Sequence, residues 1–178
     1  MTGGRTGGRP AGRRHRRGTS LVEVAVSSLV ISIMLVAVLR TVGATASAGA
    51  AAAERTRAIE LAEQLLAEIR TRAYAEPDAA TTALGVDAGE SPTRRAGWDD
   101  VDDYHDWSAT PPVDADGAPV PDAAGWTRRV RVTRVDRADP LVTAAGETGL
   151  KRITVDVERN GRVVVRRHAI VSAAGAAA

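Results

Sequence analysis

The sequence predicts an α+β protein in which one long N-terminal helix packs on a small antiparallel β-sheet. An apolar run from Leu21 to Leu39 continues into helix-favouring sequence, and β-rich alternation is confined to residues 126–172. Between two β-rich runs lies Asn160-Gly161, a dipeptide that strongly favours a hairpin turn. The 178 residues leave room for one modest folded domain besides the apolar helix.

Residues 1–18 form a basic leader that is rich in Gly, Pro and Arg and has almost no apolar residues to bury. The formal net charge of the chain is +2, and the leader alone holds six arginines: Arg5, Arg9, Arg13, Arg14, Arg16 and Arg17. Without the leader the chain is net negative, so we expect no nucleic-acid binding by the mature protein. The leader instead indicates an export or orientation signal.

The segment 19–40 is predicted to be the transmembrane half of the helix. From Leu21 to Leu39 it contains one ionisable residue, Glu23, and the apolar run ends at Arg40. About 20 apolar residues at about 1.5 Å each cover a bilayer core. The arginines before the segment place the N-terminus in the cytoplasm. We therefore expect a single-pass protein of the cytoplasmic (inner) membrane, in direct contact with lipid, whose folded head lies outside.

The segment 41–76 is predicted to be the amphipathic half of the same helix. Apolar residues recur at helical spacing and form one stripe: Ala58, Ala62, Leu65, Leu66 and Ile69. Pro77 disfavours helical geometry in the residue before it. We therefore predict a helix from Thr19 to about Tyr74, with its second half packed on a globular head.

The remaining chain divides into a loop region, a sheet and a tail. Residues 77–125 are rich in Pro, Gly, Asp and Ala and predict a long acidic loop region with short ordered pieces. Residues 126–172 predict an antiparallel β-sheet, because apolar residues alternate in both KRITVDVER and WTRRVRVTRV. The tail, residues 173–178, is expected to be disordered.

The hairpin at Asn160-Gly161 has two competing registers. A two-residue turn pairs Val157 with Val164 and Ile153 with His168, which puts Arg166 and His168 on the apolar face. A three-residue bulged turn instead pairs Val157 with Val163 and Val155 with Val165. The sequence favours neither of them.

The N-terminal segment carries a processing pattern. Gly18 ends the basic leader, Thr19-Ser20-Leu21-Val22 follows, and Glu23 is the fifth residue after the glycine, at the start of the apolar helix. This order resembles the signal of type IV prepilins and type II secretion pseudopilins, although Thr19 stands where that family usually has phenylalanine. AEQLLAEIR, WDDVDDYHDW and TGLKRITVDVERNGR also look like segments of this family, most of all of V-type minor pilins and the I-type minor pseudopilin.

The resemblance implies cleavage after Gly18 by a prepilin peptidase, N-methylation of Thr19, and assembly into a type IV pilus or a type II secretion pseudopilus. Other pilin-like subunits and an inner-membrane assembly platform would be partners. In such filaments the glutamate pairs with the α-amino group of a neighbouring subunit, which is the role implied for Glu23. A carboxylate in an apolar segment is costly, which favours such a partner. Alternatively, Glu23 is only a helix-terminal charge that the helix dipole favours.

An acidic stretch in the loop region is a candidate calcium site. It contains Asp99, Asp100, Asp102, Asp103 and Asp106, with His105 among them. Hard cations bind several oxygen ligands, which this stretch supplies densely. The alternative is a solvated acidic loop without a ligand. We expect no other cofactor and no enzymatic activity, because the chain has no cysteine and no recognisable nucleophile or base.

An ordinary secretory signal is the main rival interpretation. Ala44-Thr45-Ala46 and Ala46-Ser47-Ala48 both satisfy the small-x-small pattern of signal peptidase. Cleavage there would release a small domain, secreted or still anchored, that carries the calcium-binding acidic loop. Against it, the apolar run is longer than the usual 7 to 15 residues and contains Glu23.

Overall fold

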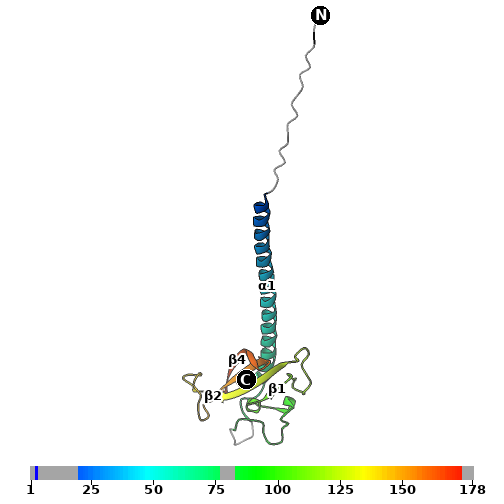
Figure 1. Cartoon of the computed structure of the whole chain (residues 1–178). Helices are drawn as coiled ribbons and strands as arrows, with labels where there is room; N and C mark the ends of the chain where they lie inside the picture. Colours follow the sequence, from blue (N-terminus) through cyan, green and yellow to red (C-terminus); the bar gives the residue numbers. More distant parts are fainter. Residues whose placement is uncertain (1–2, 4–19, 77–82, 174–178) are drawn as a thin grey trace. The chain divides into compact units, whose positions relative to one another are not determined.

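The computed structural model describes Gly3 and residues 20–76 and 83–173. The predicted leader, apart from Gly3, and residues 174–178 of the predicted tail lie outside the described residues. The chain forms two compact units that divide between Ala48 and Gly49, and each is described by itself. Helix α1 (Leu21–Arg70) contributes to both units, and the β-strands belong to the second (Figure 1).

The first unit contains the apolar part of α1. Ser20 precedes the helix, and its Oγ accepts a hydrogen bond of 3.2 Å from the backbone N–H of Glu23. Such a cap satisfies one of the N–H groups that a helix leaves unpaired at its N-terminus. Every residue from Ser20 to Ala48 is exposed, and the helix is long and apolar enough to cross a membrane. The predicted apolar N-terminal helix is thereby confirmed.

In the second unit, α1 buries one face against the sheet. The buried residues are Ala58, Leu61, Ala62, Leu65, Leu66 and Ile69, which include the whole predicted stripe. Because these residues recur every three or four positions, they lie on one side of the helix. The α+β prediction is confirmed: one helix packs on an antiparallel sheet.

The helix ends at Arg70, earlier than the predicted Tyr74. The backbone N–H groups of Thr71 and Arg72 donate to the carbonyls three residues before them. Ala73 then pairs with Asp100 in a parallel bridge, in which Ala73 N donates to Asp99 O at 3.0 Å and Val101 N donates to Ala73 O at 3.0 Å. A tertiary pairing therefore ends the helix before Pro77 is reached.

The sheet has four antiparallel strands in the order β1-β2-β3-β4. Its strands are β1 (Ser108–Ala109), β2 (Trp126–Arg134), β3 (Leu150–Arg159) and β4 (Arg162–Ser172). Alternate residues are buried, as the sequence pattern predicts. The buried side chains that face α1 include Val130, Val132, Ile153, Val155 and Val157.

The β3–β4 hairpin has a register that differs from both predicted ones. The turn is a two-residue turn, closed by the pair Arg159 and Arg162, with positive φ at Asn160 and Gly161. A bulge then shifts the pairing by one residue, so Val157 pairs with Val165 and Ile153 pairs with Ala169. The physical reason is that the bulge decides which residues of β4 face the core. It buries Val165 and Ala169 and leaves Arg166 and His168 exposed.

The segment from residue 83 to residue 125 supplies much of the core, although the sequence predicted a loop region. It contains two short 3-10 helices, η1 (Arg95–Gly97) and η2 (Asp102–Tyr104). Trp98 is fully buried, and its ring lies 4.8 Å from that of Tyr104 in an edge-on arrangement. The Trp98 indole N–H donates to Ser91 O at 2.8 Å. Irregular backbone therefore positions large core side chains.

Candidate functional site

The predicted processing site lies at the edge of the described residues. Gly18 and Thr19 lie outside them, whereas Glu23 lies in the first turn of α1 and is exposed. At this position the carboxylate is favoured by the helix dipole and is also free to meet a partner. Its geometry therefore accommodates both roles that the sequence leaves open.

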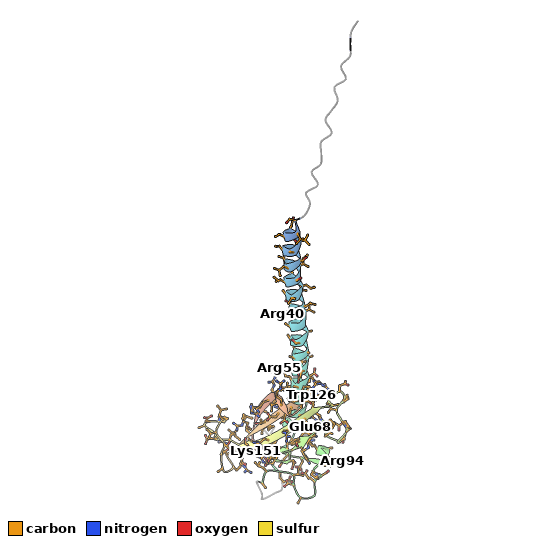
Figure 2. All side chains as sticks on the ribbon, viewed as in Figure 1. Arg40, Arg55, Glu68, Arg94, Trp126 and Lys151 are labelled. Atoms are coloured by element: carbon orange, nitrogen blue, oxygen red, sulfur yellow. The ribbon has the colours of Figure 1, made fainter. Side chains whose placement is uncertain are left out.

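Glu23 stands alone as a charge in an exposed apolar surface. Between Leu21 and Leu39 the exposed large side chains are Leu21, Val22, Val24, Val26, Leu29, Val30, Ile31, Ile33, Met34, Leu35, Val36, Val38 and Leu39. They surround the helix on all sides, and the next charged residue is Arg40, which Figure 2 labels. Soluble proteins rarely expose so large an apolar surface, so this part of α1 is a membrane anchor or a signal sequence.

The predicted calcium ligands are divided by the fold. Asp102 is buried and directed to Lys151, with Oδ2 at 2.7 Å from Nζ. Asp106 is exposed and lies 3.6 Å from the guanidinium of Arg131. Asp99, Asp100 and Asp103 instead meet three acidic residues that the sequence analysis did not single out. The structure thus places three of the five predicted ligands in acidic groups, Asp100 in one group and Asp99 with Asp103 in another.

Six carboxylates form two groups, which we call the first and the second triad. The first triad consists of Glu76, Asp87 and Asp100, and the second triad consists of Glu90, Asp99 and Asp103. Within each triad, one carboxylate oxygen of every residue lies within 4.8 Å of the others. Both triads lie in the second unit, and four of the residues also line a shallow surface pocket: Glu76, Asp87, Glu90 and Asp99.

Three backbone features assemble the triads. The Ala73–Asp100 bridge brings the chain after α1 alongside the acidic stretch. Gly85 N donates to Asp102 O at 3.0 Å, which holds the loop of residues 83–90 against η2. Asp100 Oδ1 accepts the N–H groups of Asp102 and Asp103, at 2.6 and 3.2 Å, and so fixes the turn. The first two contacts join residues far apart in the chain, so Glu76, Asp87 and Glu90 carried no local signal.

Crowding of like charges shifts the proton affinity of the triads. Burial and the nearby carboxylate of Asp99 raise the pKa of Glu76 to about 7. Burial and a contact with Asp103 raise the pKa of Glu90 to about 7. Burial and the charges of Asp103 and Asp102 raise the pKa of Asp100 to about 6. Without a cation, the triads therefore retain protons near neutral pH.

This proton retention predicts a pH-dependent stability in the presence of a chelator. Because the pKa values of Glu76, Glu90 and Asp100 are higher in the folded chain than in the unfolded one, folding takes up protons. Their contribution is complete below the unfolded pKa values and is lost as the pH rises through about 6 to 7. Urea unfolding of the full chain in detergent with EDTA should give a falling free energy of unfolding across this window. Glu90→Gln should flatten the fall, and a fall that is identical in this variant would contradict the assignment.

Two buried ion pairs hold the second unit together around the triads. Lys151, on β3, also donates to Tyr74 O at 2.6 Å and lies 4.0 Å from the centre of the Tyr74 ring. Arg95 is fully buried and makes two bonds to the Glu68 carboxylate on α1, at 2.8 and 3.0 Å. Lys151 and Glu68 are labelled in Figure 2. These pairs tie the irregular segment to α1 and to the sheet.

Neither ion pair was predicted from the sequence, although the strand pattern around Lys151 indicates the pair that it forms. Lys151 is the single lysine of the chain, and it is two residues before Ile153 in a strand whose alternation points Ile153 inward. An inward lysine in a strand requires a buried acidic partner. Arg95 lies in an irregular segment and gives no such periodic signal.

Comparisons with models of protein families, with curated protein sequences and with solved structures found no match. The class of the protein therefore follows from its architecture. A long apolar N-terminal helix that packs on a four-stranded antiparallel sheet is a pilin-like fold.

Proposed function

We propose that the chain is a non-catalytic, membrane-anchored pilin-like subunit that acts by assembly. The supporting observation is the contrast between two parts of one helix. From Leu21 to Ala48 α1 is exposed and mostly apolar, whereas from Ala58 to Ile69 it buries a single face in a folded head. A helix that only completed a soluble core would not need the first part, which is apolar on every side.

In this proposal the subunit is a minor pilin or pseudopilin of a type IV pilus or of a type II secretion pseudopilus. The basic leader keeps the N-terminus in the cytoplasm, and α1 anchors the chain in the cytoplasmic membrane with the head outside. A prepilin peptidase cleaves after Gly18, which frees the α-amino group of Thr19 for methylation. An inner-membrane assembly platform then moves the subunit from lipid into the filament.

Contacts between apolar helices would hold the subunit in the filament. Small residues along the first part of α1, namely Ala25, Ser28, Ser32 and Ala37, let neighbouring helices approach closely. Glu23 would pair with the α-amino group of a neighbouring subunit, and this pairing would set the axial position of one helix against the next. The head would remain on the outside of the helix bundle, since few of its large apolar side chains are exposed among the described residues, namely Leu141, Val142, Val163 and Ile170.

The test is the mature N-terminus of the chain recovered from membranes, measured by intact mass and by sequencing. We expect a chain that begins at Thr19 with one methyl group on its amine. Gly18→Val should leave the full-length precursor in the membrane. Ala46→Leu is the matched control, because Ala46 belongs to both small-x-small sites and the change blocks cleavage by signal peptidase at each of them. It should leave cleavage after Gly18 unaffected.

A chain that begins at Ser47 or Gly49, and whose release is blocked by Ala46→Leu, would overturn the proposal in favour of ordinary secretion. Both of these rival sites lie inside α1, which continues through them without interruption. The anchor thus has no helix break at the positions that signal peptidase would need.

A further inference from the structure

The outer face of the sheet, which points away from α1, carries a polar cleft. It is lined by residues of β2, β3 and β4 that alternate with the buried core residues, and by residues 106–108. Its volume is about 400 Å³, within the range of about 300 to 1,000 Å³ that is usual for small-ligand sites. The charged residues of the lining are Arg129, Arg131, Arg152, Arg166, Asp106 and Asp156. The cleft therefore has an excess of positive charge.

Two of the four arginines are neutralised by carboxylates on β3. Arg166 makes two bonds to the Asp156 carboxylate, at 2.5 and 2.7 Å. Arg129 donates to Glu158 Oε1 at 3.0 Å. The positive charge that remains available to a ligand therefore belongs to the other two arginines, Arg131 and Arg152.

Arg152, on β3, is held in place without being neutralised. Its Nη1 donates to the backbone carbonyls of Pro140 and Leu141, at 3.0 and 3.1 Å. These carbonyls orient the guanidinium but leave its full charge. In the part of the chain that the structure describes, no carboxylate pairs with it. Arg152 is thus a preorganised cation at the cleft, and its neutralisation calls for an anion from solution.

Three further polar groups lie around the same point of the sheet. Thr154 is two residues after Arg152, and it pairs with Arg131 on β2 and with His168 on β4. The Thr154 hydroxyl and His168 Nδ1 share a hydrogen bond of 3.0 Å. Arg131 lies 3.6 Å from Asp106, but both side chains are mostly exposed, so this pair neutralises little of its charge. Because neighbouring strands lie about 4.7 to 4.9 Å apart, one group above Thr154 is within reach of all these donors.

We propose that this cleft binds a small ligand through a phosphate group placed above Thr154. Guanidinium groups bind phosphate oxygens in a bidentate manner, and hydroxyl and imidazole groups donate further hydrogen bonds. The donors approach from three strands, which suits the three free oxygens of a phosphate monoester better than the two oxygens of a planar carboxylate. The proposal concerns the head alone and does not depend on the proposed assembly function.

The aspartates of the cleft favour a ligand with one charged group over a uniformly charged polymer. Asp156 lies between Arg129 and Arg166 in the row of residues next to the proposed phosphate position. A nucleic acid presents a phosphate at every nucleotide, so a strand laid across the sheet would bring its phosphates to this carboxylate. A single phosphate above Thr154 avoids it.

The proposal is tested on the full chain in detergent. Inorganic phosphate, glycerol 3-phosphate and acetate are titrated by isothermal calorimetry, and NMR signals of the His168 ring report binding at the cleft. Arg152→Gln removes the oriented guanidinium, and Arg131→Gln removes the second one without loss of the bonds to Pro140 and Leu141. Arg162→Gln is the matched control, since it deletes the same charge from the same sheet outside the cleft.

We expect one molecule of glycerol 3-phosphate per chain, with a saturable shift of the His168 signals. Arg152→Gln and Arg131→Gln should each weaken binding by about tenfold or more, because each removes hydrogen bonds between charged groups. Arg162→Gln should leave binding unchanged, and acetate should bind at least about tenfold more weakly. Near-ultraviolet circular dichroism checks that every variant keeps the native packing of its tryptophans.

A second preparation separates the two sources of a phosphate monoester, a soluble ester and a lipid headgroup. The chain is placed in lipid nanodiscs with and without phosphatidic acid, in buffer free of phosphate. A shift of the His168 signals with phosphatidic acid supports the site and assigns it to a lipid, whereas unchanged signals assign it to a soluble ester that binds in detergent. No saturable binding at millimolar glycerol 3-phosphate, equal binding of acetate, equal losses in all three variants, or tighter binding of an oligonucleotide would overturn the proposal.

Discussion

Glu23→Ala is expected to abolish incorporation of the chain into a filament while leaving its membrane insertion intact. Insertion of a single helix becomes easier when a charge is deleted from its apolar segment. Assembly brings helices together at low dielectric, where the α-amino group of a neighbouring subunit would lose its opposite charge. Loss of one partner of such a buried pair costs about 3 to 5 kcal/mol, or a few hundredfold or more in the equilibrium for subunit addition.

The measurement combines recovery of sheared filaments with membrane fractionation. Glu23→Gln keeps the size of the side chain and removes its charge, so it should fail in the same way, whereas Glu23→Asp should retain part of the assembly. Ser20→Ala is the structural control, because it removes the cap of α1 without touching the carboxylate. Normal assembly of Glu23→Ala would reduce Glu23 to a helix-terminal charge.

Lys151→Met is expected to destabilise the head by about 3 to 5 kcal/mol. The side chains of Lys151 and Asp102 are 0% and 6% exposed, so the change leaves a carboxylate buried without its ammonium partner. It also removes the donor to Tyr74 O, which lies next to the bridge that ends α1. Urea unfolding of the full chain in detergent, followed by tryptophan fluorescence, measures the loss.

Two further variants separate the buried charge from the lost side chain. Arg131→Met breaks a pair with Asp106 whose side chains are 71% and 65% exposed, and it should cost less than about 1 kcal/mol. Adding Asp102→Leu to Lys151→Met removes the stranded charge and should restore much of the stability. If Lys151→Met costs no more than Arg131→Met, the ion pair does not stabilise the head.

Periodic elements of this fold were predictable from local sequence. The stripe from Ala58 to Ile69 repeats at helical spacing, and Ile153, Val155 and Val157 alternate along a strand. In both elements the buried face is set by residues only a few positions apart. The fold class was predictable from the helical periodicity and the strand alternation alone.

Nonlocal pairing explains where the sequence interpretation went wrong. The end of α1 depends on the bridge between Ala73 and Asp100, which are far apart in the chain. The hairpin register depends on a bulge at Val164, which matters because it turns Arg166 outward. No rule of local spacing contains the bridge, and the bulge follows only when the pattern of buried residues along β4 is compared with that along β3.

Only half of the residues in the candidate cation site were predictable, because the other half join it through nonlocal contacts. Asp99, Asp100 and Asp103 lie in one dense acidic stretch and attract attention in the sequence. Glu76 and Asp87 reach them only because the chain folds back after α1. Conversely, Asp102 belongs to the same stretch, but it pairs with the buried Lys151 and is part of neither triad.

The strand order β1-β2-β3-β4 has a consequence for self-association of the head. It leaves β4, with eleven residues, at one margin of the sheet and the two-residue β1 at the other. A long free margin is a template on which another copy of the chain would add a strand and begin to aggregate. β4 carries Arg162, Arg166 and Arg167, of which Arg166 pairs with Asp156 on β3 and Arg167 pairs with Glu63 on α1. Charged side chains on an edge strand make the edge-to-edge addition of another strand unfavourable, and β1 is too short to nucleate it.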